Sequence, residues 1–256
     1  MKKVALITGA TSGIGKATAC MFASNGYNLI ITGRRSNRLI DLKNKLKKED
    51  DSIRVFDLSF DVRNENEVKK AFAELPDLWR RIDVLVNNAG LALGLDPIDS
   101  GNLEDWNRMI DTNVKGLLYV TYEVVQLMKK RKINGHIVNI GSIAGKEVYP
   151  NGSVYCATKH AVDALSKGMR MDLLKHNIKV TQICPGAVET EFSMVRFNNN
   201  TKRAKAVYEG YEALVADDIA DCIWFAVSRP PHVNINDMLV MPSAQASSSV
   251  FFKNKP

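Results

Sequence analysis

The sequence predicts a single α/β domain, built on a doubly wound sheet of seven parallel strands with helices on both faces. Short runs rich in valine, isoleucine and leucine alternate with amphipathic helical stretches along the whole chain. A glycine-rich turn directly follows the first of these runs. The length of 256 residues suits one domain, because a domain of this size buries most of the surface of its unfolded chain.

The runs interpreted as strands are continuously apolar rather than alternating. This character is typical of parallel strands that are buried on both faces of a sheet. We expect strands at Lys3–Thr8, Asn28–Thr32, Ile53–Ser59, Ile82–Val86, His136–Ile140, Ile178–Cys184 and Asp237–Met241.

The stretches between them have the apolar spacing of helices that pack one face against a sheet. Helices are expected at Ile14–Ser24, Arg38–Lys47, Asn66–Ala73, Leu103–Lys130, Val154–His176 and Asp217–Val227. Residues 191–212 break this rhythm, because they are polar and rich in asparagine, and they are our candidate for a mobile lid. Residues beyond about Ser243 are expected to be loosely ordered.

Composition narrows the classes of protein to consider. No apolar run has the length of a membrane helix. The apolar run after Lys3 stops at Thr8-Gly9, which is too early for a signal peptide. The four cysteines form no Cys-x-x-Cys pair, so separate reduced thiols are favoured over disulfides or a metal site. We therefore expect a cytosolic protein that contains no metal.

The net charge of +7 raises the question of nucleic-acid binding. Basic residues cluster at Lys43–Lys48 and Lys129–Lys132, where we expect helix ends. Because cations are favoured near helix C-termini, solvent-exposed helix ends explain these clusters better than a nucleic-acid site. The positive field would also attract an anionic cofactor or substrate.

The glycine-rich turn lies between the first strand and the first helix. Glycines at such a turn let the main chain approach a pyrophosphate, whose charge the N-terminus of the helix stabilises. The spacing is Gly-x-x-x-Gly-x-Gly, and its context strengthens a motif that alone would be weak. The sequence therefore predicts a Rossmann-like dinucleotide site at Gly9, Ala10, Thr11, Ser12, Gly13, Ile14 and Gly15.

The end of the second strand indicates which dinucleotide binds. NAD sites usually have an acidic residue about 20 residues after the glycine motif, where it holds the ribose 2′-hydroxyl. Here Arg34 and Arg35 follow the strand, and the first carboxylate is Asp41. Since arginine binds a 2′-phosphate through charge-assisted hydrogen bonds and an acid would repel it, we predict NADP as cofactor.

A tyrosine and a lysine stand four residues apart at the start of a predicted helix, so Tyr155 and Lys159 share one face. A phenol has a pKa of about 10, and a nearby ammonium group is expected to lower it. Ser142 follows a predicted strand, at the carboxyl edge where such sheets bind ligands. These three side chains predict an acid–base site, with Tyr155 as the group that exchanges the proton.

With these features together, the sequence resembles the short-chain dehydrogenase/reductase family over nearly its whole length, to about Pro242. The motifs that carry the resemblance are the glycine turn, Asn87-Asn88-Ala89-Gly90, Asn113, Ser142, Tyr155-x-x-x-Lys159 and Pro185-Gly186.

The resemblance implies a role for each of these positions. Tyr155 would exchange a proton with the substrate oxygen, and Ser142 would hydrogen-bond the same oxygen. Lys159 would bind the nicotinamide ribose, and Asn113 would hold a water that connects Lys159 to solvent. The remaining cofactor contacts would come from Asp61 and Val62 at the adenine, from Asn88, Ala89 and Gly90 at the adenosine ribose, and from Pro185, Gly186, Val188 and Thr190 at the nicotinamide and phosphates.

Several segments resemble one subgroup, the NADP-dependent 3-hydroxy acid dehydrogenases, which act on serine, L-allo-threonine and similar acids or on the matching semialdehydes. They are residues 90–97, 111–116, 190–197 and 232–236. Such a substrate carries a carboxylate, so the pocket should offer a cation. Arg196 is the first candidate for this cation, and the alternative is that it is a solvent-exposed loop residue. Lys146 is the second candidate.

Other functions stay open at this stage. A broader carbonyl or 3-ketoacyl reductase would share the same motifs, although the subgroup segments count against it. An NADPH-binding regulator without catalysis would not need the proton-transfer residues. The two long helices, 103–130 and 154–176, have more apolar residues than one buried stripe requires, and family members commonly pair through them. We therefore predict a homotetramer.

Overall fold

The computed structural model describes residues 2–254 and contains a sheet of seven strands in the order β3-β2-β1-β4-β5-β6-β7. All neighbouring strands run parallel. From β1, strands β2 and β3 extend the sheet on one side, and strands β4 to β7 extend it on the other side. This is the predicted doubly wound sheet, and its strands are β1 (Val4–Ile7), β2 (Asn28–Gly33), β3 (Val55–Ser59), β4 (Val84–Asn87), β5 (His136–Ile140), β6 (Lys179–Pro185) and β7 (Asp237–Val240).

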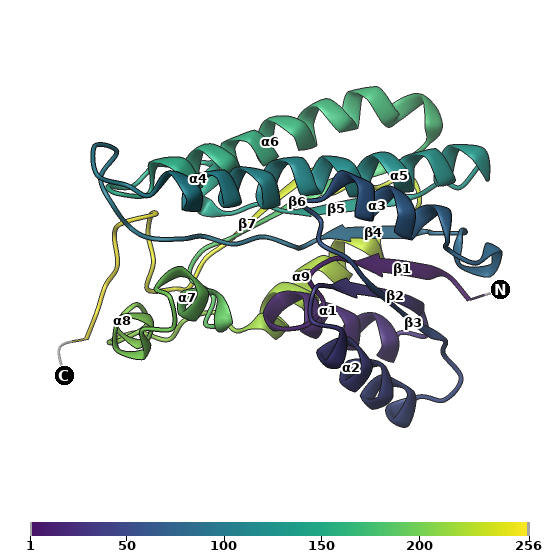
Figure 1. Cartoon of the computed structure of the whole chain (residues 1–256), viewed down its shortest axis with the longest axis horizontal. Coiled ribbons are helices and arrows are strands. Elements are labelled where there is room, and N and C mark those ends of the chain that lie inside the picture. The colour runs from purple at the N-terminus through teal and green to yellow at the C-terminus, as the bar shows by residue number, and fades with distance from the viewer. Residues whose placement is uncertain (1, 255–256) are drawn as a thin grey trace.

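Helices cover both faces of the sheet (Figure 1). On one face lie α1 (Gly13–Ser24), α2 (Ser36–Glu49) and α9 (Ala216–Val227). On the other lie α3 (Glu65–Ala73), α4 (Leu103–Ile110), α5 (Leu117–Lys130) and α6 (Ser153–Leu173). The fold is thus the single three-layer domain that the sequence predicts.

Two apolar layers result, because successive residues of a strand point to opposite faces of the sheet. Leu6 belongs to the core cluster that includes Val120 of α5, whereas Ile7 belongs to the cluster that includes Phe22 of α1. All four side chains are fully buried. A strand covered on both faces is mostly apolar at successive positions, which explains the apolar runs in the sequence. Buried Asn139 in β5 and Gln182 in β6 are polar exceptions.

The long helix expected at residues 103–130 is interrupted. Between α4 and α5 the chain forms one wider π-helical segment, η2 (Asp111–Gly116), without leaving the helical path. Such segments are rare and occur frequently at functional sites. Asn113 lies within it.

The segment expected to form a lid contains two short helices, α7 (Glu191–Arg196) and α8 (Thr201–Ala206). The tail, for which the sequence predicts little order, makes definite contacts. Gln245 is buried and its side-chain oxygen accepts a hydrogen bond from the Ala187 amide at 2.8 Å. The amide of Asn254 donates to the Gly210 carbonyl. Contacts with the loop after β6 and with Gly210 therefore fix residues that have no strong local preference.

The four cysteines are free thiols, and Cys156 and Cys184 are buried. Among the helices of residues 2–254, none combines the length and the apolar character that a bilayer crossing requires.

Candidate active site

A cavity of about 330 Å³ opens at the carboxyl edge of the sheet, where the strand order reverses between β1 and β4. Ligands of doubly wound sheets bind at this point. Most of the residues singled out from the sequence line it: Gly9, Thr11, Ser12, Gly13, Ile14, Arg34, Arg35, Asp61, Val62, Asn88, Ala89, Gly90, Ser142, Tyr155, Lys159, Pro185, Gly186, Val188 and Thr190. Ala10, Gly15, Asn113 and Arg196 do not.

The glycine turn presents an uncapped helix N-terminus to this cavity. Gly9 and Gly13 have φ angles of 66° and 50°, in the left-handed region that favours glycine. Ser12 is the N-cap residue of α1, yet its side chain accepts no capping hydrogen bond, and the first turn of α1 has no acidic residue. The first amides of α1 are therefore suited to bind an anionic group.

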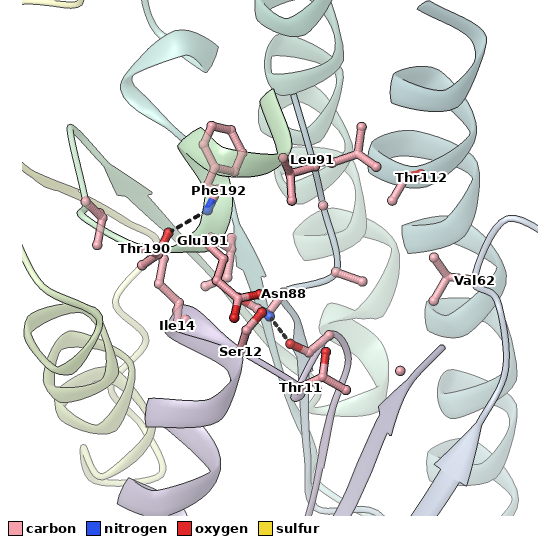
Figure 2. A pocket seen from close by; sticks show the side chains of 18 of the residues that line it. Thr11, Ser12, Ile14, Val62, Asn88, Leu91, Thr112, Thr190, Glu191 and Phe192 are labelled. Atoms are coloured by element: carbon pink, nitrogen blue, oxygen red, sulfur yellow. Dashed lines mark hydrogen bonds between the residues drawn. The ribbon is translucent and has the colours of Figure 1, made fainter. Parts of the chain in front are cut away.

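Gly15 and Ala10 lie behind the turn and shape it. A Cβ atom at Gly15 would lie 2.4 Å from Asn88 Nδ2 and 2.4 Å from the Gly9 oxygen, so only glycine allows this close approach. Asn88, which lies beside this turn in Figure 2, in turn donates from Nδ2 to the carbonyls of Thr8 and Gly9. Ala10 is buried, and its amide donates to the Thr32 carbonyl at 3.0 Å. Both residues fix the turn.

At the far end of the cavity, Arg34 and Arg35 follow β2 and each faces a carboxylate. Arg34 lies 3.8 Å from Asp61, which itself is held by Arg63 at 2.6 Å. Although partial burial opposes it, these contacts, with Arg63 the stronger, lower the pKa of Asp61. Arg35 lies 3.1 Å from Glu191, the first residue of α7.

The three side chains of the expected acid–base site meet at the opposite end of the cavity. Tyr155 and Lys159 lie one turn apart on α6, and the ammonium group is 5.9 Å from the centre of the phenol ring. Lys159 Nζ donates to the Ile140 carbonyl at the end of β5, at 2.9 Å. Ser142 follows the same strand end, and its Oγ accepts from the Ala144 amide at 3.1 Å. All three side chains are buried.

Burial, and not the neighbouring charge, dominates the proton affinities of this pair. It raises the pKa of the Tyr155 phenol above its ordinary value, whereas the Ser142 hydroxyl and the Arg196 charge lower it by less. The lowered Tyr155 pKa expected from the sequence is therefore not found, because the effect of burial exceeds that of the nearby groups. Burial lowers the pKa of Lys159 to about 8, so the amine is still mostly charged at pH 7. The phenol keeps its proton at neutral pH, and its donation requires a neighbouring group that stabilises the phenolate.

Asn113 lies behind these residues and not in the cavity wall. Its amide group forms two hydrogen bonds of 2.9 Å with the main chain of Leu91, and it donates to Thr158 Oγ1 at 3.0 Å. A Cβ atom at Gly90 would lie 3.2 Å from Asn113 Oδ1 and 3.8 Å from Lys159 Nζ. The π-helical segment thus aims Asn113 at the loop after β4, next to the ammonium group.

The two candidate cations have different surroundings. Arg196 donates to the Gly94 carbonyl at 3.1 Å and to the Tyr149 hydroxyl at 3.0 Å, and its guanidinium carbon lies 5.8 Å from the Tyr155 ring. It lines a smaller neighbouring pocket that also reaches Tyr155. Lys146 instead forms ion pairs with Asp163 and Asp237 at 2.5 and 2.6 Å, outside both pockets. The second candidate for a substrate cation is therefore wrong.

Other cavity residues lie in the segments that resemble the subgroup, but the sequence did not single them out individually. Leu91 and Thr112 line the cavity beside the expected motifs, and Glu191, Phe192 and Val195 project from α7. The ring of Phe192 lies 5.8 Å from that of Tyr155. The resemblance marks these segments as a whole, and the tertiary fold shows which of their side chains face the cavity.

Comparisons with known proteins agree with this geometry. The family profile described as short chain dehydrogenase matches residues 3–201. The chain is 46% identical to the NADP-dependent 3-hydroxy acid dehydrogenase YdfG of Salmonella typhi, over 95% of this chain and 96% of that protein. It is 43% identical to sulfoacetaldehyde reductase 2 of Chromohalobacter salexigens, over 97% and 98%. A solved closed form of serine dehydrogenase complexed with NADP+ has a TM-score of 0.91 at 42% identity, covering 98% of this chain and 100% of that one.

A doubly wound sheet with a glycine turn and a tyrosine–lysine pair at its carboxyl edge defines a dinucleotide-dependent oxidoreductase. Within that class, the chain belongs to the short-chain dehydrogenase family. The resemblance stated from the sequence is thereby confirmed.

The buried ammonium group of Lys159 gives a prediction for stability. Its pKa falls from 10.5 to about 8 on folding, so below pH 8 the folded state holds a charge that it disfavours. We expect Lys159→Met to raise the free energy of unfolding at pH 7 by up to about 3 kcal/mol. The wild type gains stability as the pH rises through 8 toward 10.5, so the difference should shrink over that range.

Urea unfolding at pH 7 and pH 9.5 measures this effect. Lys175→Met, at an exposed position beyond the end of α6, is the matched control and should change little. A Lys159→Met variant that is equally destabilised at both pH values would contradict the prediction.

Proposed function

We propose that the chain is an NADP-dependent oxidoreductase that interconverts small 3-hydroxy acids with their 3-oxo acids or semialdehydes. The observation that carries this proposal is the shared cavity, which joins the glycine turn and two arginines at one end to Tyr155, Lys159 and Ser142 at the other. The names of the relatives support the same cofactor and the same substrate class.

The cavity fits a dinucleotide with an extra phosphate. The uncapped N-terminus of α1 would bind the pyrophosphate, and the guanidinium groups of Arg34 and Arg35 would bind the 2′-phosphate. Asp61 and Val62 would contact the adenine, Asn88, Ala89 and Gly90 the adenosine ribose, and Pro185, Gly186, Val188 and Thr190 the nicotinamide end. When bound, the nicotinamide would give the hydride in the reductive direction as NADPH and accept it in the oxidative direction as NADP+.

Tyr155 donates a proton to the substrate oxygen during reduction and removes it during oxidation. Its buried phenol is protonated at neutral pH, which suits the reductive direction. The Ser142 hydroxyl, held at the end of β5, hydrogen-bonds the same oxygen and stabilises the negative charge that develops on it. The ammonium group of Lys159 stabilises charge on the phenol during transfer and holds the nicotinamide ribose.

Asn113 is a positioning residue. Its hydrogen bonds fix the loop at Leu91 and, through Thr158, the helix turn that carries Tyr155, because Thr158 donates to the Tyr155 carbonyl at 2.7 Å. Its proximity to Lys159 also supports the proposed water link from the ammonium group to solvent.

Arg196 supplies the charge that selects an acidic substrate. Within residues 2–254 its guanidinium group has no ion-pair partner, and it lies against the Tyr155 ring. Its two hydrogen bonds go to neutral oxygens, so further donors are available to an anion. A substrate with a carboxylate on the carbon next to the reacting one fits a guanidinium group beside Tyr155. The uncharged chain of a general carbonyl or 3-ketoacyl substrate fits it less well. A sulfonate would have the same charge, in keeping with the sulfoacetaldehyde reductase among the relatives.

Assembly and location are also proposals. Tyr122 on α5 and Met171 on α6 are 61% and 72% exposed, and Leu118 is also exposed. These apolar side chains support a tetramer formed through the two long helices. The free cysteines are typical of a reducing compartment and support a cytosolic enzyme.

Tyr155→Phe removes the acidic hydroxyl while keeping the ring. We expect kcat to fall by about 10²–10⁴-fold, because general acid–base catalysis contributes that much. The dissociation constant for NADPH, followed by fluorescence, should stay within about twofold. Tyr122→Phe, on the surface of α5, is the control, and activity of Tyr155→Phe within tenfold of wild type would exclude the proton-transfer role.

Arg196→Ala tests the substrate class. With NADPH absorbance as the readout, we expect the KM for a semialdehyde bearing a carboxylate to rise about 10–100-fold, the value of a lost charge-assisted hydrogen bond. Neutral aldehydes and ketones should be affected little. Arg203→Ala, in the same segment but outside the pockets, is the control. An unchanged KM for the acidic substrate would disprove the anion contact.

Light scattering at micromolar concentration tests the assembly. We expect the mass of four 28.5 kDa chains. A monomer would contradict the proposal.

A further inference from the structure

Glu191 connects the lid segment to the arginines at the cofactor end of the cavity. It is the first residue of α7 and lines the cavity together with Arg35. Its carboxylate accepts hydrogen bonds from Arg35 Nη1 at 3.1 Å and from Arg38 Nη1 at 2.8 and 2.9 Å. In Figure 2 it extends toward the turn that carries Thr11 and Ser12, whereas Phe192 points the opposite way.

Four of the five N–H groups of Arg35 are already engaged. Nε and Nη2 donate to Thr11 Oγ1 at 3.3 and 2.7 Å, Nη2 donates to Ser12 Oγ at 3.0 Å, and Nη1 donates to Glu191. Within residues 2–254 the second Nη1 N–H has no acceptor, so a 2′-phosphate that binds Arg35 through two N–H groups has to replace at least one of these acceptors. Glu191 is the only anion among the three.

We propose that Glu191 is a specificity-determining residue whose carboxylate competes with the 2′-phosphate of NADP for Arg35. This inference rests on the proposed NADP site. In the absence of that phosphate, the carboxylate balances the charge of two arginines that lie 156 and 153 residues away in the sequence. When the phosphate binds, Arg35 turns to it and Glu191 stays on Arg38.

Competition follows from charge. A carboxylate and a phosphate that share one guanidinium group repel each other, and the repulsion raises the dissociation constant of any ligand with a 2′-phosphate. Arg38 limits this effect, because it holds Glu191 with two short contacts. The side chains of Arg35, Arg38 and Glu191 are 44%, 45% and 46% exposed, so water and salt also screen the interaction. We therefore expect Glu191 to weaken the binding of ligands with a 2′-phosphate moderately and not to prevent it.

Calorimetric titration of Glu191→Gln tests the proposal, because the amide keeps the shape and removes the charge. We expect NADPH and adenosine 2′-monophosphate to bind about fivefold more tightly than to the wild type. NADH and adenosine 5′-monophosphate should change by less than about twofold. The gain should shrink at 1 M salt. Glu189→Gln, an exposed carboxylate two residues away, should change none of these affinities.

A double-mutant cycle locates the effect. In an Arg35→Met background, Glu191→Gln should give no further gain for adenosine 2′-monophosphate. Unchanged or weaker NADPH binding by Glu191→Gln would overturn the proposal, as would an equal gain from Glu189→Gln. A wild-type chain that does not prefer NADPH to NADH would contradict the NADP assignment itself, and the inference with it.

Discussion

The ammonium group of Lys159 lies inside the protein, and much of the site is arranged around this charge. Moving such an ion from water into a protein interior costs several kcal/mol. A main-chain carbonyl at the end of β5 accepts one of its hydrogen bonds, and the absence of a Cβ atom at Gly90 leaves space beside it. The same burial keeps Tyr155 protonated. A cation next to a neutral phenol helps the phenol to donate its proton, because the ammonium group stabilises the phenolate that forms.

Helix α7 connects the two ends of the cavity. Glu191 at its start contacts the arginines after β2 and at the start of α2, and Arg196 at its end contacts the loop that contains Gly94. Between them, Phe192 packs near the Tyr155 ring. Because one short helix carries all three contacts, its position depends on both the cofactor end and the substrate end. The segment is therefore well placed to respond to either ligand.

The fold could be predicted from the sequence because the relevant signals are local. Continuous apolar runs, the glycine turn and the four-residue spacing of Tyr155 and Lys159 each depend on neighbouring residues. What could not be predicted depends on residues far apart in the chain. Glu191 pairs with arginines more than 150 residues away, and Lys146 is neutralised by two aspartates from α6 and β7. The direction of the Tyr155 pKa was missed because spacing reveals a neighbouring charge but not the loss of water around it.

The π-helical segment η2 has an effect on the outside of the molecule as well. Widening one turn adds a residue relative to a regular α-helix, and each residue advances the helix by about 100°. The whole of α5 is therefore rotated relative to α4, and the outward direction of Leu118 and Tyr122 is set by the same turn that aims Asn113 inward. Deleting one residue there would restore regular winding but would swing the outer face of α5 around its axis. The same six residues of η2 thus determine both the position of Asn113 in the interior and the face of α5 that is exposed to other molecules.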